Sequence, residues 1–268
     1  MNLIDTHCHI HESDFPLDRE SVLAAGAAAG VAKIICVGTS RQSSREAVAF
    51  AKNFSGKSGV KIFATVGIHP HETAKLAQKD IDSLEKLVCD NSKTVVGIGE
   101  IGLDYFYEFA PRNRQIKALE AQLDLAQKFN LPISFHVRDG AKNGHSAFAD
   151  LWAILANFDC DFRAVLHSYT EQNRENLKKA LERNFYFGVN GIATFAKPTE
   201  QNLWRDIPLA KILLETDAPF LAPVPFRGWP NQPSLIPKIA ENLAKLKHET
   251  YQNIAQTTTE NAAKLFKI

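Results

Sequence analysis

The sequence predicts a single (β/α)8 barrel with extra helices at its carboxyl end, and three observations support this fold class. Short β-branched runs recur eight times, and longer segments with helical spacing separate them. Most runs are almost continuously apolar, which is typical of parallel strands that are buried on both faces. The length of 268 residues matches the roughly 250 residues that such a barrel usually takes.

The predicted strands alternate with predicted helices along the whole barrel region, which favours a closed barrel over an open, doubly wound sheet. The clearest helix covers 111–130, where Pro111 suits the first turn and Leu119 and Leu123 lie on one apolar stripe. Weaker helical patterns cover 22–29 and 73–87. The predicted strands are 3–6, 34–37, 62–66, 94–98, 132–135, 164–166, 186–189 and 212–214.

The pattern changes after the eighth strand. Residues 218–233 are rich in proline and are predicted to be mostly irregular, because each proline removes a backbone donor and fixes φ. Helices are predicted at about 235–247 and again near the end, where Thr257-x-x-Glu260 resembles a capping box for the last helix. No linker, repeat or low-complexity segment divides the chain, so residues 1–268 are predicted to form one domain.

Composition and charge narrow the classes of function. Lys and Arg number 31 against 30 Asp and Glu, for a net charge of +1, with no sign of the concentrated basic surface that wraps duplex DNA. A local patch is compatible with these totals, so a nuclease stays open. No secretory pattern and no apolar run of about 20 residues is visible. We therefore expect a cytoplasmic monomer with no membrane partner and with its four scattered cysteines reduced.

Imidazoles and carboxylates stand at the ends of most predicted strands. In a barrel these ends lie on one face, where active sites are built, so residues more than two hundred positions apart converge. Taken alone, each of these residues is also compatible with a structural role in a loop or an ion pair. Together they predict a metal site. They are His7 and His9 after strand one, His69 after strand three, Glu100 after strand four, His136 and His167 at strands five and six, and Asp217 after strand eight.

At two of these positions, the neighbouring residues indicate where the side chains point or what they need. The spacing His7-x-His9 points both imidazoles the same way, while Cys8 points to the opposite face and is expected to pack in the core. Glu100 emerges among glycines and apolar residues, and a buried carboxylate needs a partner. Glu100 could be a structural ion-pair member or a bridge between two cations, and Asp217 poses the same question.

These motifs resemble the TatD family of metal-dependent deoxyribonucleases, within the wider amidohydrolase-like hydrolases. The resemblance covers essentially the whole chain and implies ligands at His7, His9, Glu100, His136, His167 and Asp217. The chain departs from the usual family pattern at Gly140, Trp229 and Gln232, which lie in loops expected near the site mouth and concern substrate preference. The motifs are Asp5-Thr6-His7-Cys8-His9, Gly67-Ile68-His69-Pro70-His71, Gly99-Glu100-Ile101-Gly102-Leu103-Asp104-Tyr105, His136-x-Arg138, His167-Ser168, Leu214-Glu215-Thr216-Asp217-Ala218-Pro219, Arg227-Gly228 and Thr258-Thr259-Glu260-Asn261-Ala262.

Six ligand groups exceed the three that a mononuclear catalytic site usually uses, so we expect two divalent cations. His7, His9 and Asp217 are assigned to one, His136 and His167 to the other, and Glu100 to the bridge. Imidazoles favour Zn²⁺, Mn²⁺ or Co²⁺, and carboxylates leave room for Mg²⁺. Asp217 and Glu100 are the predicted catalytic residues; Asp217 either accepts the proton of the attacking water or only binds metal.

Substrate contacts are predicted next to this centre. His69, Arg138 and Arg227 are candidates for holding phosphate; a salt bridge to Asp139 is the alternative for Arg138. The aromatic run 105–109 could stack unpaired bases or pack its own loop onto the barrel. The resemblance implies an enzyme that trims DNA, at single-stranded or 3′ ends. The alternatives are a hydrolase of a small amide, lactone or phosphate ester, and a non-enzymatic scaffold.

Overall fold

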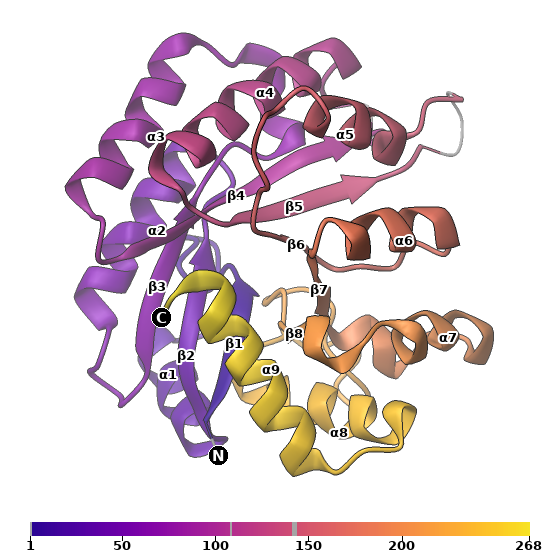
Figure 1. Ribbon diagram of the computed structural model, residues 1–268. Helices are drawn as coiled ribbons and strands as arrows, with labels where there is room; N and C mark the ends of the chain where they lie inside the picture. The colour runs from indigo at the N-terminus through magenta and orange to yellow at the C-terminus, as the bar shows by residue number, and fades with distance from the viewer. Residues whose placement is uncertain (1, 108, 141–143) are drawn as a thin grey trace.

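Eight parallel strands form one sheet whose order follows the chain from β1 to β8. The computed structural model describes residues 2–107, 109–140 and 144–268 (Figure 1). The predicted (β/α)8 barrel is confirmed. Its strands are β1 (Leu3–Cys8), β2 (Val31–Val37), β3 (Lys61–Val66), β4 (Val95–Asp104), β5 (Ile133–Arg138), β6 (Ala164–Leu166), β7 (Tyr186–Val189) and β8 (Ile212–Leu214).

Contacts between β1 and the end of β8 bring the barrel close to closure. The Thr6 hydroxyl donates to the Leu214 carbonyl oxygen at 3.0 Å. The buried Asp5 carboxylate accepts from the Thr216 amide at 2.9 Å and from its hydroxyl at 2.6 Å. The Asp217 amide donates to the His7 carbonyl oxygen at 2.9 Å, so these contacts place two predicted ligands beside each other.

Helices follow the strands and cover the outside of the barrel (Figure 1). Short 3₁₀ turns add η1 (Pro70–Lys75), η2 (Gly191–Thr194), η3 (Leu209–Lys211) and η4 (Pro233–Leu235). No helix in the described part of the chain is long and apolar enough to cross a bilayer. The helices are α1 (Arg19–Ala28), α2 (Arg41–Phe54), α3 (Gln78–Asp90), α4 (Arg112–Phe129), α5 (Ala147–Leu155), α6 (Arg174–Glu182), α7 (Pro198–Asp206), α8 (Ile236–Lys247) and α9 (Tyr251–Phe266).

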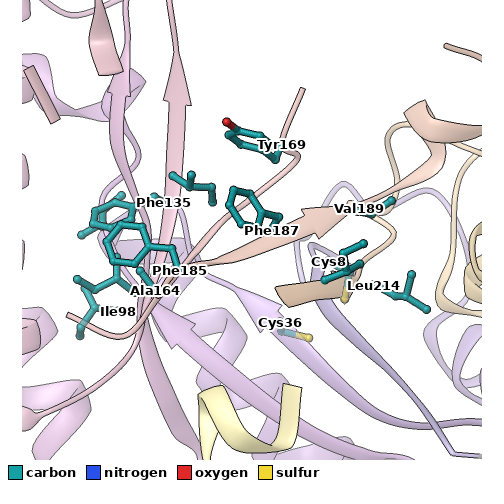
Figure 2. Packing of buried hydrophobic residues seen from close by; sticks show 14 of the residues in the cluster. Cys8, Cys36, Ile98, Phe135, Ala164, Tyr169, Phe185, Phe187, Val189 and Leu214 are labelled. Carbon is teal, nitrogen blue, oxygen red and sulfur yellow. The ribbon is translucent and has the colours of Figure 1, made fainter. Parts of the chain in front are cut away.

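The core divides into a large cluster and a smaller one. In the large cluster, Phe135 of β5 packs with Phe185, which directly precedes β7, and with Phe187 of β7 (Figure 2). The smaller cluster joins residues from seven strands to Leu265 and Phe266 of α9. Thr259 and Asn261 of α9 donate to the carbonyl oxygens of Asn2 and Ile212, at the amino ends of β1 and β8. The helix therefore covers that end of the barrel and leaves the carboxyl end for the site.

The predicted start of the last helix was wrong. Thr257 and Glu260 lie inside α9, and the helix begins after Thr250, whose hydroxyl accepts from the Asn253 amide at 3.1 Å. A Thr-x-x-Glu pattern also occurs inside helices. Here the Glu260 carboxylate accepts a hydrogen bond from the Gln256 side chain, one turn earlier in α9, at 2.9 Å.

Two further boundaries differ. The predicted helix over 73–87 is divided between η1 and α3, because the backbone turns out of the 3₁₀ helix at Leu76 before α3 begins. Glu100 lies within β4 and not after it, since this strand continues to Asp104. The segment 218–233 is mostly irregular, as its prolines predicted.

Candidate active site

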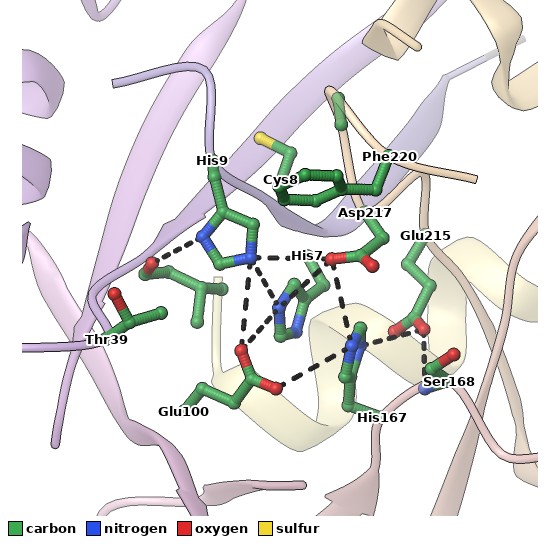
Figure 3. Close-up of polar contacts among 12 residues, drawn as sticks. His7, Cys8, His9, Thr39, Glu100, His167, Ser168, Glu215, Asp217 and Phe220 are labelled. Atoms are coloured by element: carbon green, nitrogen blue, oxygen red, sulfur yellow. Dashed lines mark hydrogen bonds and ion pairs between the residues drawn. The ribbon is translucent and has the colours of Figure 1, made fainter. Parts of the chain in front are cut away.

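Histidines and acidic residues from separate strands converge at the carboxyl end of the barrel (Figure 3). They make three overlapping groups, and within each group the possible ligand atoms lie within 4.8 Å of one another. The sequence analysis assigned His136 and His167 to one cation. In the structure His69 lies beside His136, and the ring of His167 stacks on that of His7. The groups are His7, His9 and Asp217; His7, Glu100 and His167; and His69, Glu100 and His136.

Glu100 lies between the groups. One carboxylate oxygen, Oε2, is 3.4 Å from His7 Nε2 and 3.9 Å from His9 Nε2. The other, Oε1, is 2.8 Å from His136 Nδ1 and 3.6 Å from His69 Nε2. The neighbouring glycine at 102 lets β4 approach β5 at this point, since a Cβ there would overlap the carbonyl oxygen of His136. A carboxylate in this position has one oxygen available to each side.

The His7–His9–Asp217 group has its possible ligand atoms directed toward one another. His9 Nδ1 lies 3.0 Å from the Val37 carbonyl oxygen, which only accepts, so Nδ1 carries a proton and Nε2 is the nitrogen that can bind a cation. That Nε2 is 3.2 Å from His7 Nε2 and 3.4 Å from Asp217 Oδ1. Two imidazole nitrogens and a carboxylate oxygen that face one another this closely fit a divalent cation in their donor chemistry.

Buried carboxylates support two of the histidines from behind. His136 Nε2 is 2.8 Å from Asp104 Oδ2, on the opposite side of the ring from Glu100. His167 Nδ1 is 2.9 Å from Glu215 Oε1, and that oxygen also accepts from the Ser168 amide at 2.7 Å. Such partners orient a metal-binding imidazole and raise its basicity.

The carboxylates of the site stay ionised although they are buried. Burial alone would raise the pKa of Glu100, but the surrounding imidazoles, with His69 and His167 first, hold it well below its usual value. Burial likewise opposes ionisation of Asp217, and His167 and His9 outweigh it and lower its pKa. Both groups therefore offer negative charge at neutral pH.

The surroundings lower the pKa of some of these histidines and raise the pKa of others. Burial lowers the pKa of His7, and it lowers the pKa of His69 to about 3, against the opposing charge of Glu100. Burial also disfavours the charged form of His136 and His167, yet their carboxylate neighbours raise the pKa to about 9 and to about 10. For His9, Asp217 outweighs burial and raises the pKa. A cation bound here must therefore displace protons.

The loop after β8 presents Asp217 with a positive φ. This φ of +59° lies in the left-handed region, which Gly, Asn and Asp adopt more readily than other residues. The fully buried Asn231 holds this loop: its side-chain amide donates to the carbonyl oxygens of Thr216 and Phe220, both at 2.7 Å. These two hydrogen bonds of a buried amide fix the loop that carries Asp217.

A cleft of about 970 Å³ opens above the converging side chains, and all the ligand-type groups except His7 line it. Tyr107 on one side is 41% exposed, and Phe220 on another is 59% exposed, with its ring centroid 6.4 Å from that of His9. Phe109, 64% exposed, lies 4.8 Å from His71 between ring centroids. Exposed aromatic faces therefore surround the entrance.

Comparison with known proteins gives one consistent result. The model of the family described as TatD related DNase matches residues 4–267. The chain belongs to the TatD family. The uncharacterized metal-dependent hydrolase YabD of Bacillus subtilis is 34% identical over 270 residues, which is 99% of each chain. The 3′-5′ ssDNA/RNA exonuclease TatD of Salmonella typhimurium is 31% identical over 272 residues, again 99% of each chain.

A solved structure of a relative has the same fold as this chain. The crystal structure of YjjV, a TatD homolog from Escherichia coli K12, has a TM-score of 0.87 to this chain at 30% identity, covering 99% of this chain and 98% of that one. The chain is thus a member of a family of metal-dependent hydrolases with a barrel fold.

Of the two arginines that were predicted to hold phosphate, one lines the cleft of this TatD-family protein and the other does not. Arg138 lines the cleft, with its guanidinium carbon 4.0 Å from the ring centroid of Phe106. Asp139 instead accepts from backbone amides at the start of α5. Arg227 lies over Phe195 at 3.7 Å and is not among the residues that line the cleft.

The aromatic run after β4 has a mixed arrangement. Tyr105 packs onto the barrel, since it is 7% exposed and its hydroxyl donates to Asp150 at 2.6 Å. Phe106, Tyr107 and Phe109 are exposed at the surface.

The four cysteines are free, and Cys8 lies in the core as its strand position predicted.

Sequence reasoning missed the supporting residues Asp104, Glu215 and Asn231. Asp104 stood inside the motif Gly102-Leu103-Asp104, but its spacing from Glu100 gave no reason to pair it with His136 on the next strand. The signal that could have found it is the strand register, in which Gly102 of β4 pairs with His136 of β5.

Proposed function

We propose that this TatD-family protein removes nucleotides from the 3′ ends of single-stranded DNA by metal-dependent hydrolysis of the phosphodiester bond. The observation that carries the proposal is the Glu100 carboxylate, which lies between two groups of ligand atoms at the base of a cleft with aromatic walls. A relative named 3′-5′ ssDNA/RNA exonuclease, 31% identical over nearly the whole chain, supports the choice of substrate.

The donor set fits two divalent cations. His7, His9 and Asp217 would hold one, Glu100 would bridge, and His136 would hold the second together with His167 or His69. Imidazole with carboxylate suits Zn²⁺, Mn²⁺ or Co²⁺ better than Mg²⁺, which prefers oxygen ligands. When bound, two such cations supply a nucleophilic water at neutral pH and stabilise the charge on the leaving oxygen.

The chain's own groups handle the proton and the substrate. Asp217 accepts the proton of the attacking water at a carboxylate oxygen, because its lowered pKa keeps it ionised and its loop holds it at the cleft. Arg138 contacts a phosphate of the strand at the cleft edge. Tyr107 and Phe220 stack on unpaired bases, which a duplex would not expose.

A small-molecule substrate is the second candidate, and one observation favours it. Glu12, Asp14 and Glu72 also line the cleft, and their negative charges oppose a polyanion on that side. A short amide, lactone or phosphate ester would avoid this repulsion. The same cations would activate water against its carbonyl carbon or phosphorus.

The two candidates are separated by one comparison of rates. The protein is supplied with Mn²⁺ or Zn²⁺ and assayed on a single-stranded oligonucleotide and on a panel of small esters, amides and lactones. Asp217→Asn and an EDTA-treated sample serve as controls. A nuclease loses kcat/KM on DNA steeply as salt rises from 50 to 200 mM, because it displaces counterions from the strand. Efficient turnover of a small ester with no DNA cleavage rejects the nuclease and supports the alternative.

A further inference from the structure

We propose that Asp104 is a positioning residue that fixes the tautomer of His136 and ties this metal-binding ring to the aromatic loop at the cleft entrance. The inference rests on the proposed metal centre. It concerns one buried carboxylate whose side chain contacts two imidazoles and two backbone amides.

The two carboxylate oxygens of Asp104 have separate partners. Oδ1 accepts from the amides of Phe106 at 2.9 Å and Tyr107 at 3.0 Å. Oδ2 lies 2.8 Å from His136 Nε2 and 3.1 Å from His71 Nε2. The residue is 0% exposed, so water does not replace any of these partners.

The backbone of Asp104 is fixed as firmly as its side chain. Its amide donates to the Gln115 side-chain carbonyl at 2.8 Å, and its carbonyl oxygen accepts from the Gln115 side-chain amide at 2.9 Å. The reciprocal pair joins the end of β4 to α4, which leaves the carboxylate little freedom to follow a displaced ring.

The contact with His136 decides which ring nitrogen can bind metal. An ionised carboxylate only accepts, so the Nε2 that faces Asp104 carries a proton. Nδ1 faces a second carboxylate, with Glu100 Oε1 at 2.8 Å, so it can also carry a proton until a cation displaces it. Asp104 then keeps the remaining proton on Nε2, which leaves the lone pair of the neutral imidazole on Nδ1. Asp104 is placed as an acceptor on both sides, because Oδ1 accepts from two backbone amides and Oδ2 faces two imidazole nitrogens.

An amide at this position cannot serve both sides. Backbone N–H groups cannot reverse, so the oxygen of an asparagine would face Phe106 and Tyr107 and its NH₂ would face His136 Nε2. The imidazole can reverse, by carrying its proton on Nδ1 instead. That tautomer removes the lone pair from the side of Glu100 and prevents ligation there, although the side chain keeps its shape.

Asp104→Asn tests the inference, with Asp139→Asn as the matched control. Asp139 is also a carboxylate near the end of β5 that accepts from backbone amides, and within residues 2–107, 109–140 and 144–268 it makes no hydrogen bond or ion pair with an imidazole. Metal content and the affinity of each site are measured by titration against a chromophoric chelator. We expect the weaker site of Asp104→Asn to lose affinity 10–100-fold, and Asp139→Asn to bind as the wild type does.

A second readout separates positioning from simple loss of structure. Long-range ¹H–¹⁵N spectra of the zinc-loaded proteins report which nitrogen of His136 is protonated, and circular dichroism reports folding. Wild-type protein is expected to carry the proton on Nε2. Two unchanged affinities in a folded Asp104→Asn, or a proton on Nδ1 in the wild type, would overturn the inference. Wild-type protein that binds no divalent metal would instead defeat the proposed function.

Discussion

Gly188 in β7 offers a test of the support behind His167 without changing any charged residue. A Cβ added at Gly188 would lie 2.6 Å from Cδ and 2.7 Å from Oε1 of Glu215, distances that require the carboxylate to move. Glu215 is 1% exposed, and its Oε1 accepts from the Ser168 amide and lies 2.9 Å from His167 Nδ1. Gly188→Ala therefore displaces the carboxylate from the position in which it contacts both partners.

The magnitude follows from what the carboxylate loses. The hydrogen bond from the Ser168 amide to this charged group contributes about 1.5–3 kcal/mol, and for a chain of this size each 1 kcal/mol lowers Tm by roughly 2–4 °C. We expect Tm to fall by about 3–12 °C. Because His167 loses its orienting partner, metal affinity or activity is expected to fall 10–100-fold. A loss of metal affinity or activity beside the loss of stability distinguishes this site from an ordinary packing defect.

Gly26→Ala is the matched control. Gly26 lies in α1, where a Cβ would meet nothing nearer than 3.8 Å, so the same substitution should stabilise the helix by about 0.5–1 kcal/mol. Differential scanning fluorimetry gives Tm, and metal titration gives the affinity. If Gly188→Ala binds metal and hydrolyses substrate as well as Gly26→Ala does, Glu215 does not support His167 in the way argued.

Three other predictions follow from the site and the corrected helix. The pKa values of His136 and His167 are raised from 6.5 to about 9 and to about 10. The ion pairs of these two rings therefore stabilise the metal-free fold fully below pH 6.5, and this stabilisation is lost as the pH rises through 9 to 10. A cation must displace these protons, so its apparent affinity should increase between pH 6 and 8; calorimetry in buffers of different ionisation enthalpy that finds no released proton would contradict this. Tyr107→Ala should weaken binding of single-stranded DNA by about 1–3 kcal/mol, measured as KM, while hydrolysis of a small phosphate ester stays unchanged; equal losses on both substrates would speak against base stacking. Thr250→Ala should destabilise the protein by about 0.5–2 kcal/mol in urea unfolding, and a larger loss from Thr257→Ala would restore the helix start expected from the sequence.

The fold and the ligand-type residues could be predicted because both depend on short-range patterns. Apolar runs mark buried parallel strands, and in a barrel every strand end reaches the same face. His7 and Asp217 could therefore be placed together although most of the chain separates them. The prediction needed the order of the strands and no side-chain detail.

The supporting residues could not be predicted, because their roles depend on which side of a ring they meet. Glu215 and Asp217 are two residues apart and would share a face in a continuous strand. The strand ends at Leu214 and Asp217 adopts positive φ, so Glu215 lies at Nδ1 of His167 and Asp217 nearer Nε2. Tertiary packing decides this, and the sequence spacing alone does not.

The grouping of the ligands also depends on tertiary detail. His69 was predicted to contact phosphate, and its ring lies 4.4 Å from that of His136 between centroids, beside Glu100. The turn from β3 into η1 sets this position, since His69 Nδ1 accepts from the His71 amide at 3.2 Å and directs Nε2 inward. Whether His69 binds metal or phosphate stays a prediction, as do the cytoplasmic location and the monomeric state.

The most direct test of the central claim is the digestion of single-stranded DNA labelled at its 5′ end, followed over time on a sequencing gel with Mn²⁺ and with EDTA. The proposed function predicts a ladder that shortens from the 3′ end one nucleotide at a time with Mn²⁺, and no shortening with EDTA or in Asp217→Asn. DNA that stays intact with every divalent cation, in a protein that binds two equivalents of metal, would contradict it.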